Sequence, residues 1–485
     1  MRAGPVVRSI CAALVAAGIA FVAGTSAGAS EEVVTGAGWS QYQGDAAHSG
    51  VATAAPTPPF GVAWATATGV GDETHFAGIP APVITGDAAV VVDREDVTAV
   101  SLATGEIAWT IPRALGPSAP AAVAAEGGRT TILFTEGGGD LSSSASSTPT
   151  PSPSSSPSPA ERSTLVAVNA SDRKVRWRLL LPDVSVGGPT VDGSTVLVGT
   201  DDGSVTAVDL TSGDQRWSVD LGDSVNTPIA AADGSAYVAV SAGAREPGFL
   251  ASLRETDGSQ RWRSPLGAAG SSISAPAVVD GSVYATVNDG SIRATDAATG
   301  SVRWAAKLNA VTGGGSPAVT SDAVVVADVR GQVYRYASGT GERIWDFAMN
   351  APVYGATVIA GSAVLVGDSS GDVSAIDLQT GARIWRGGVG QGLLLALAIA
   401  PETVVATRTG PSAGLVALTA DPNGTLIHEQ SPTIVEPVEL GLAWAAAAVP
   451  LVLLLALAGR FLAARLGPVA FGSGDEEFEP TDDDG

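Results

Sequence analysis

The sequence predicts an all-β protein. We expect an eight-bladed β-propeller of four-stranded antiparallel blades, with an N-terminal strand closing the ring, followed by one C-terminal transmembrane helix. Three observations predict this architecture. Tryptophans recur at steps of 40 to 45 residues, each one ends a phrase that reads as strand, glycine turn and strand, and an uncharged 20-residue segment follows the last repeat.

Residues 1–29 have the organisation of a secretory signal peptide. Two arginines precede an apolar run from Ile10 to Gly24, and small residues before Ser30 offer a cleavage site. An uncleaved membrane anchor is the alternative. The single cysteine, Cys11, lies inside the run, so a chain cleaved before Ser30 has no disulfide, thiolate metal site or cysteine nucleophile.

Residues 30–61 form a lead-in segment before the first predicted strand. It contains the stretch WSQYQGDAAHSG, Trp39 to Gly50, in which we find no helix or strand period. His48 is the candidate ligand or base of this stretch, but we expect a structural role for it. The other histidines, His75 and His428, are not spaced with it as a zinc site, and no cysteine supports them.

Residues 62–430 are the predicted propeller. One tryptophan step, 68 residues from Trp109 to Trp177, is too long, and it contains the Ser/Pro-rich tract 140–163. Such a tract cannot build a packed core, so we expect a solvated loop. The tryptophans that we expect to mark the blades are Trp64, Trp109, Trp177, Trp217, Trp262, Trp304, Trp345 and Trp385.

Each repeat phrase makes physical sense as two strands joined by a tight turn. In AVDLTSGDQRW (207–217), an alternating strand leads into TSGD, where glycine takes the positive φ angle of the turn. Only Arg173 breaks the rule that glycine precedes tryptophan by four residues. The turn glycines are Gly105, Gly213, Gly258, Gly300, Gly341 and Gly381, and we expect Asp209, Asp296 and Asp377 to accept bonds from turn amides.

Ring closure follows from the count of strands. Eight four-strand repeats are present, while the strand at 62–66 has no first three strands of its own. We therefore expect it to complete the last blade, whose own fourth strand has His428 in place of tryptophan. Seven or nine blades are the alternatives.

The C-terminal part predicts a membrane anchor. A linker at 431–439 leads to residues 440–459, about 30 Å of uncharged helix, which matches one bilayer core. Arg460 and Arg465 follow and place the acidic tail 460–485 in the cytoplasm. We thus expect a single-pass cell-membrane protein with an extracytoplasmic propeller.

The net charge of −23 makes nucleic acid an unsuitable partner, because an acidic surface repels phosphate backbones. Solubility is the simplest reason for this acidity.

The phrase AxDxxTGxxxW, complete at 294–304 and 375–385, resembles the tryptophan-docking motif of propeller repeats of the pyrroloquinoline-quinone (PQQ) type. The opener WSQYQGDAAHSG resembles the segment before the first strand in many such proteins. The resemblance implies that each tryptophan packs flat between neighbouring blades, near the turn glycine of an adjacent copy. The same propeller serves quinoprotein dehydrogenases, BamB-like envelope scaffolds and sensor domains.

Three functions are therefore compatible with the sequence. We prefer a membrane-anchored, non-enzymatic scaffold that binds envelope or membrane proteins, or cell-surface ligands. A PQQ-dependent quinoprotein dehydrogenase is one alternative, and a single-pass receptor signalling through the acidic tail is the other.

The resemblance to quinoprotein dehydrogenases implies a quinone and a calcium ion at the ring centre, a catalytic aspartate, and a disulfide between adjacent cysteines. This chain has no cysteine pair, and we match no residue to the calcium or catalytic positions. The turns 200–204, 288–291 and 367–372 supply too few oxygens for calcium and read as hairpin turns. We predict no catalytic residue, no metal ligand and no cofactor.

Overall fold

The computed structural model describes residues 38–68, 80–138, 162–241, 247–269, 274–287, 289–313, 315–410, 413–421 and 423. All of them belong to one compact unit, Val33–Gly485. The predicted signal peptide, linker, membrane helix and tail, nearly all of the Ser/Pro tract, His75 and His428 lie outside the described residues. In the part of the chain that is described, no helix is long and apolar enough to cross a bilayer.

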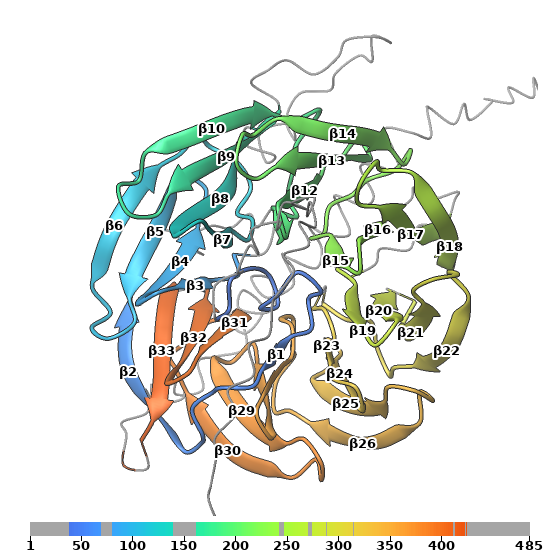
Figure 1. The fold of residues 1–485 in the computed structure, drawn as a ribbon. Helices are drawn as coiled ribbons and strands as arrows, with labels where there is room; N and C mark the ends of the chain where they lie inside the picture. Colours follow the sequence, from blue (N-terminus) through green and yellow to red (C-terminus); the bar gives the residue numbers. More distant parts are fainter. Residues whose placement is uncertain are drawn as a thin grey trace, which may run out of the picture. The chain divides into compact units, whose positions relative to one another are not determined.

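Eight blades, each with four antiparallel strands, follow one another around a ring, as predicted, and a fifth, parallel strand joins the sheet of blade 7 (Figure 1). Blades 1 to 4 contain, from the inside outward, β3 (Val83–Thr85), β4 (Ala88–Val92), β5 (Asp96–Ser101) and β6 (Ile107–Pro112); β7 (Ala122–Glu126), β8 (Arg129–Gly137), β9 (Ser163–Asn169) and β10 (Val175–Leu180); β11 (Thr190–Asp192), β12 (Thr195–Gly199), β13 (Ser204–Asp209) and β14 (Gln215–Asp220); and β15 (Ala230–Ala232), β16 (Ser235–Val240), β17 (Pro247–Arg254) and β18 (Gln260–Ala269).

Blades 5 to 8 continue the same order. They contain β19 (Ala277–Val279), β20 (Ser282–Val287), β21 (Ser291–Asp296) and β22 (Val302–Lys307); β23 (Ala318–Val319), β24 (Ala323–Ala327), β25 (Gln332–Ala337) and β26 (Arg343–Ala348); β27 (Val358–Ala360), β28 (Ala363–Gly367), β29 (Asp372–Asp377) and β30 (Arg383–Gly388); and β31 (Leu394–Ala400), β32 (Thr403–Arg408), β33 (Gly414–Ala420) and β2 (Phe60–Thr66).

The composition of each strand follows from its place in the blade. The second strands are covered on both faces by neighbouring blades, and their centres are mainly apolar. AAVVV in β4 is apolar and buried throughout. The outer strands alternate, because only one face packs against a neighbour; QRWSVD in β14 buries its tryptophan and exposes the residues beside it. The core is therefore a set of layers between blades.

The ring closes through β2, which pairs antiparallel with β33 and sets Trp64 opposite Ala417. This confirms eight blades and an N-terminal closing strand. The strand begins at Phe60, two residues earlier than expected, because Phe60 pairs with Ala420. At the Ser/Pro tract, Ser163 already belongs to β9, where it pairs with Gly137.

Candidate functional site

The lead-in crosses the centre of the ring and bonds to its inner strands one after another (Figure 1). In six blades an amide of the innermost strand donates to a lead-in carbonyl. These bonds are Ile84 to Trp39 (2.6 Å), Val123 to Ser40 (2.7 Å), Ala231 to Ala46 (2.7 Å), Val278 to Ala47 (2.8 Å), Val319 to Ser49 (2.7 Å) and Ile359 to Gly50 (2.8 Å).

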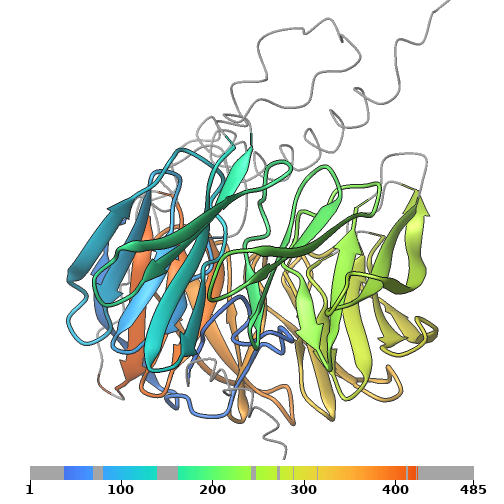
Figure 2. The same cartoon turned by 45° about the horizontal axis from the view of Figure 1, so that its top comes forward.

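The two remaining blades are reached by side chains. In blade 3, the amide of Gln41 holds Val191 through both backbone groups, accepting its N–H at 2.8 Å and donating to its carbonyl at 3.1 Å. In blade 8, Ala396 belongs to the same buried hydrophobic cluster as Tyr42. The lead-in then forms the short strand β1 (Val51–Ala52), which pairs parallel with β27 of blade 7. Figure 2 shows this blue segment toward one face of the ring.

Unpaired amides explain why a segment of this kind is present. The innermost strands are only two to three residues long in six blades, and only β27, which pairs with β1, has an inner partner strand among the described residues. The inward backbone groups of the others therefore need acceptors and donors. One signal in the sequence accompanies these positions. In six of the seven, proline stands two or three residues before the residue that bonds the lead-in, as in SAPAV (274–278). This proline spacing is the sequence signal that could have indicated the centre.

His48 is fully buried in the middle of this segment. Its Nδ1 lies 3.1 Å from the carbonyl of Pro276, its Nε2 lies 3.5 Å from the hydroxyl of Thr190, and its ring meets Tyr42 edge-on at 5.3 Å. Burial lowers the pKa of His48 to about 4, so the ring is neutral near pH 7. A neutral, enclosed imidazole with both nitrogens beside protein groups is suited to positioning the lead-in.

Most of the other hydrogen-bonding side chains of the lead-in are neutral. Gln43 donates to the carbonyls of Thr357 and Ser316, and the hydroxyl of Tyr42 lies 3.1 Å from that of Ser316. Burial raises the pKa of Tyr42. The one acid of the stretch, Asp45, accepts bonds from the backbone and hydroxyl of Ser49. These groups are satisfied within the chain.

The predicted blade-marking tryptophans lie between blades and close to turn glycines. A Cβ added to Gly105, Gly213, Gly258, Gly300, Gly341 or Gly381 would lie within 2.8 Å of the preceding blade's indole, and each glycine has a positive φ. Six indoles also donate to the carbonyl three residues before that glycine. These are Trp64, Trp177, Trp217, Trp262, Trp304 and Trp345, at 2.7 to 3.0 Å.

Trp109 and Trp385 have different surroundings. Trp109 belongs to blade 1. The turn of the next blade, between β9 and β10, has Arg173 at the glycine position, with φ +59°. Trp385 faces the closing blade. There the ring of Phe60, at the start of β2, meets the Trp385 ring edge-on, with 5.0 Å between the ring centroids.

The aspartates that precede the turns do accept turn amides. Asp209 bonds Thr211 and Ser212, and Asp296 and Asp377 make the equivalent pairs. The hydrogen bond from Arg303 lowers the pKa of Asp296 to about 2. These carboxylates are fixed acceptors in turns.

The turns considered for calcium close on themselves in the same way. Asp202 accepts from the amide and hydroxyl of Ser204, and Asp368 accepts from the amides of Ser370 and Asp372. Among the described residues, no group of three histidine, cysteine, aspartate or glutamate side chains is arranged to hold a metal ion.

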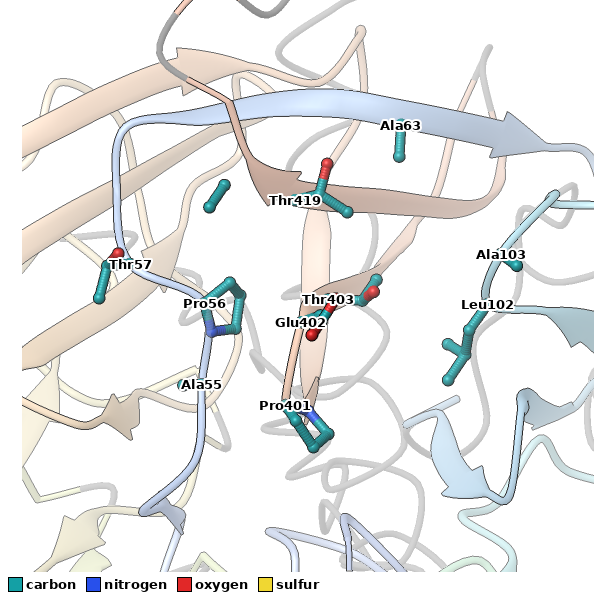
Figure 3. Close-up of a pocket in the computed structure, with 11 residues that line it drawn as sticks. Ala55, Pro56, Thr57, Ala63, Leu102, Ala103, Pro401, Glu402, Thr403 and Thr419 are labelled. Atoms are coloured by element: carbon teal, nitrogen blue, oxygen red, sulfur yellow. The ribbon is translucent and has the colours of Figure 1, made fainter.

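A pocket of about 450 Å³ lies at the seam where the ring closes (Figure 3). Its walls come from the lead-in at 55–57, Ala63 of β2, the end of β33, the turn at 401–403 and the blade 1 turn at 102–103. The lining is apolar and threonine-rich, with Glu402 as its one ionisable side chain. Reasoning from the sequence missed this pocket, because it joins segments more than 300 residues apart.

Comparison with known proteins agrees with the repeat pattern. A family model described as "Outer membrane protein assembly factor BamB" matches residues 140–288 and 288–432, more than half of the 485 residues. The curated protein of that name from Yersinia pestis is 23% identical over 199 residues. That match covers 38% of this chain and 49% of the Yersinia protein, so it spans about half of the relative's length.

Two solved structures share the fold. BamB from Moraxella catarrhalis superposes with a TM-score of 0.53 at 20% identity, covering 70% of this chain and 96% of that one. The quinohemoprotein alcohol dehydrogenase from Comamonas testosteroni gives a TM-score of 0.58 at 12% identity, covering 86% of each chain. At these identities the likeness concerns the fold alone.

Proposed function

We propose that this chain, which belongs to the family described as outer membrane protein assembly factor BamB, is a non-enzymatic scaffold that binds envelope proteins through the outer surfaces of its propeller. The observation that carries the proposal is the lead-in, because it fills the ring centre with buried, internally bonded groups. Binding surfaces are then the loops, turns and blade edges that remain exposed.

The packing of the lead-in also supports the proposal that this chain does not use PQQ. A cofactor at the level of the lead-in needs the space that Tyr42, Gln43 and His48 occupy, and these side chains are at most 3% exposed. Their polar atoms are bonded to the chain itself, and the acid nearest to them, Asp45, is held by Ser49. The described residues at this level therefore do not fit a quinone beside a calcium ion.

We further propose that the propeller is extracytoplasmic and held at the membrane by the uncharged segment 440–459. A tether of this kind keeps the ring close to other envelope and membrane components, which suits a scaffold. It raises the effective concentration of the ring for partners in the same membrane.

The first experiment is a calorimetric titration of the detergent-purified full chain with PQQ, with and without calcium. We expect no heat of binding in either condition. Tight, calcium-dependent binding would overturn the non-enzymatic scaffold and favour the quinoprotein dehydrogenase.

Photo-crosslinking in the native membrane then tests the scaffold directly. A crosslinking residue replaces Glu402 at the seam pocket or Ser212 in an exposed turn, and His48 in the buried lead-in serves as the matched interior control. Envelope proteins captured at the exposed positions and not at the interior one support the proposal. Loss of all crosslinks at the surface positions contradicts it.

A further inference from the structure

The outer edge of blade 2 departs from the pattern of the other blades. We call residues 171–180 the blade 2 edge: the turn after β9 together with β10. At the turn position where six other blades have glycine, blade 2 has Arg173 in the left-handed conformation, φ +59°. The turn itself is unchanged, since the Arg173 amide bonds the Asn169 carbonyl at 2.8 Å, as Gly213 bonds Asp209. An arginine here is strained, so its presence calls for a reason outside the turn.

The blade 2 edge is basic in an acidic molecule. The segment SDRKVRWRLL has four cationic residues and one acid, so its net charge is +3, against −23 for the whole chain. The corresponding edge of blade 3, TSGDQRWSVD, has a net charge of −1. A local positive strip of this kind attracts anionic groups that the rest of the surface repels.

Within the described residues, two of these four cations have no ion pair and a third has only an exposed one. Arg173 and Arg176 bond carbonyl and hydroxyl oxygens, and neither has an ion pair among the described residues. Lys174 lies 3.5 Å from Asp172, but both side chains are exposed, so this pair is weak. Only Arg178, 3.2 Å from Glu136, has a partly buried carboxylate beside it.

Apolar surface lies between these charges. Val175 is 42% exposed and Leu180 is 46% exposed. Within the described residues, β10 is the one outer strand with two large exposed hydrophobic side chains. It is also the terminal strand of its sheet, on the outer rim of the ring, so its outward backbone donors and acceptors have no strand partner (Figure 1).

We propose that the blade 2 edge binds an extended acidic segment of a partner protein by strand addition to β10. The backbone of β10 supplies main-chain hydrogen bonds, Arg173, Lys174 and Arg176 pair with carboxylates, and Val175 and Leu180 contact apolar side chains between those carboxylates. This inference deepens the scaffold function and rests on it, because it names the chemistry of the partner.

The test uses the full chain and a soluble peptide that alternates glutamate with valine, labelled for fluorescence anisotropy. We expect saturable binding of this peptide and none of an equally long lysine–valine peptide. The double variant Arg173→Glu/Lys174→Glu should weaken binding at least tenfold, whereas Arg343→Glu/Arg383→Glu, the same charge change on blades 6 and 7, should leave it within twofold.

A second variant separates binding from folding. Arg173→Gly restores the residue that the other turns use, so this variant should fold and have a higher unfolding midpoint. Its affinity for the acidic peptide should nevertheless fall severalfold. The inference is overturned if the acidic peptide does not bind, or if the control variant Arg343→Glu/Arg383→Glu weakens peptide binding as much as Arg173→Glu/Lys174→Glu does. It is also overturned if the chain binds vesicles with 30% phosphatidylglycerol and does not bind the acidic peptide. None of these outcomes bears on the PQQ titration, which tests the scaffold function separately.

Discussion

Gly300→Ala tests whether tryptophan docking holds neighbouring blades together. The turn requires φ +74° at this position, and a left-handed alanine costs about 1–2 kcal/mol. The added Cβ would also lie 2.7 Å from Cδ2 and 2.8 Å from Cε3 of Trp262, well inside contact distance. Forcing a methyl into a packed site costs about 1–3 kcal/mol. We therefore expect Gly300→Ala to lower the free energy of unfolding by about 2–5 kcal/mol.

The matched control is Gly234→Ala. Gly234 has φ +66°, but nothing lies within 4 Å of its added Cβ, so this variant pays the backbone cost without the clash. Urea unfolding followed by circular dichroism measures both variants against the parent. If the two substitutions destabilise the protein equally, the indole does not constrain its neighbour, and the role assigned to the tryptophans is wrong. If Trp262→Ala removes the extra cost of Gly300→Ala in a double-mutant cycle, the clash is with the indole itself.

The remaining predictions concern the lead-in and the turns. Gln41→Ala leaves both backbone groups of Val191 without their partner, so it should cost about 1–3 kcal/mol by urea unfolding, while Gln41→Glu should restore only the acceptor. Because burial lowers the pKa of His48 to about 4, the unfolded ring is protonated before the folded one, so stability falls as pH drops from about 6.5 to 4. His48→Asn should remove about 3 kcal/mol of this dependence, seen as the difference between the two pH profiles. The bond from Arg303 holds the pKa of Asp296 at about 2, so the stabilisation by Asp296 is present above about pH 4 and lost toward pH 2; Asp296→Asn should flatten the unfolding midpoint in that window.

The repeat pattern predicted the ring because it records local and periodic requirements. Each turn needs a residue with positive φ and each blade needs a bulky group against its neighbour, so glycine and tryptophan recur at a fixed separation. The closing strand was also predictable, because Trp64 lies in a strand that has no three strands before it.

The centre was not predictable in the same way. Trp39 to Gly50 bonds six inner strands through backbone carbonyls, and a backbone acceptor leaves no mark on residue type. The side chains that do leave a mark, Gln41 and His48, are ones that also occur in sites of chemistry. The seam pocket depends on segments that meet only when the ring closes, so no single stretch of sequence indicates it.

A repeat protein supplies its own controls, because each blade shows what a position needs for folding alone. Four residues after the tryptophan, six blades have Leu, Met or Val, while blade 1 has Arg113, which is 8% exposed. Burial lowers the pKa of Arg113 to about 10, and its guanidinium donates to the carbonyls of Asp93 and Pro117. Arg113 thus replaces apolar contact with bonds inside the chain. Arg173 breaks the pattern at the surface, where it bonds the carbonyl of Ser171 and makes no ion pair with another described residue. The same kind of departure therefore has an internal explanation in blade 1 and lacks one in blade 2, which is why the blade 2 edge is assigned to a partner.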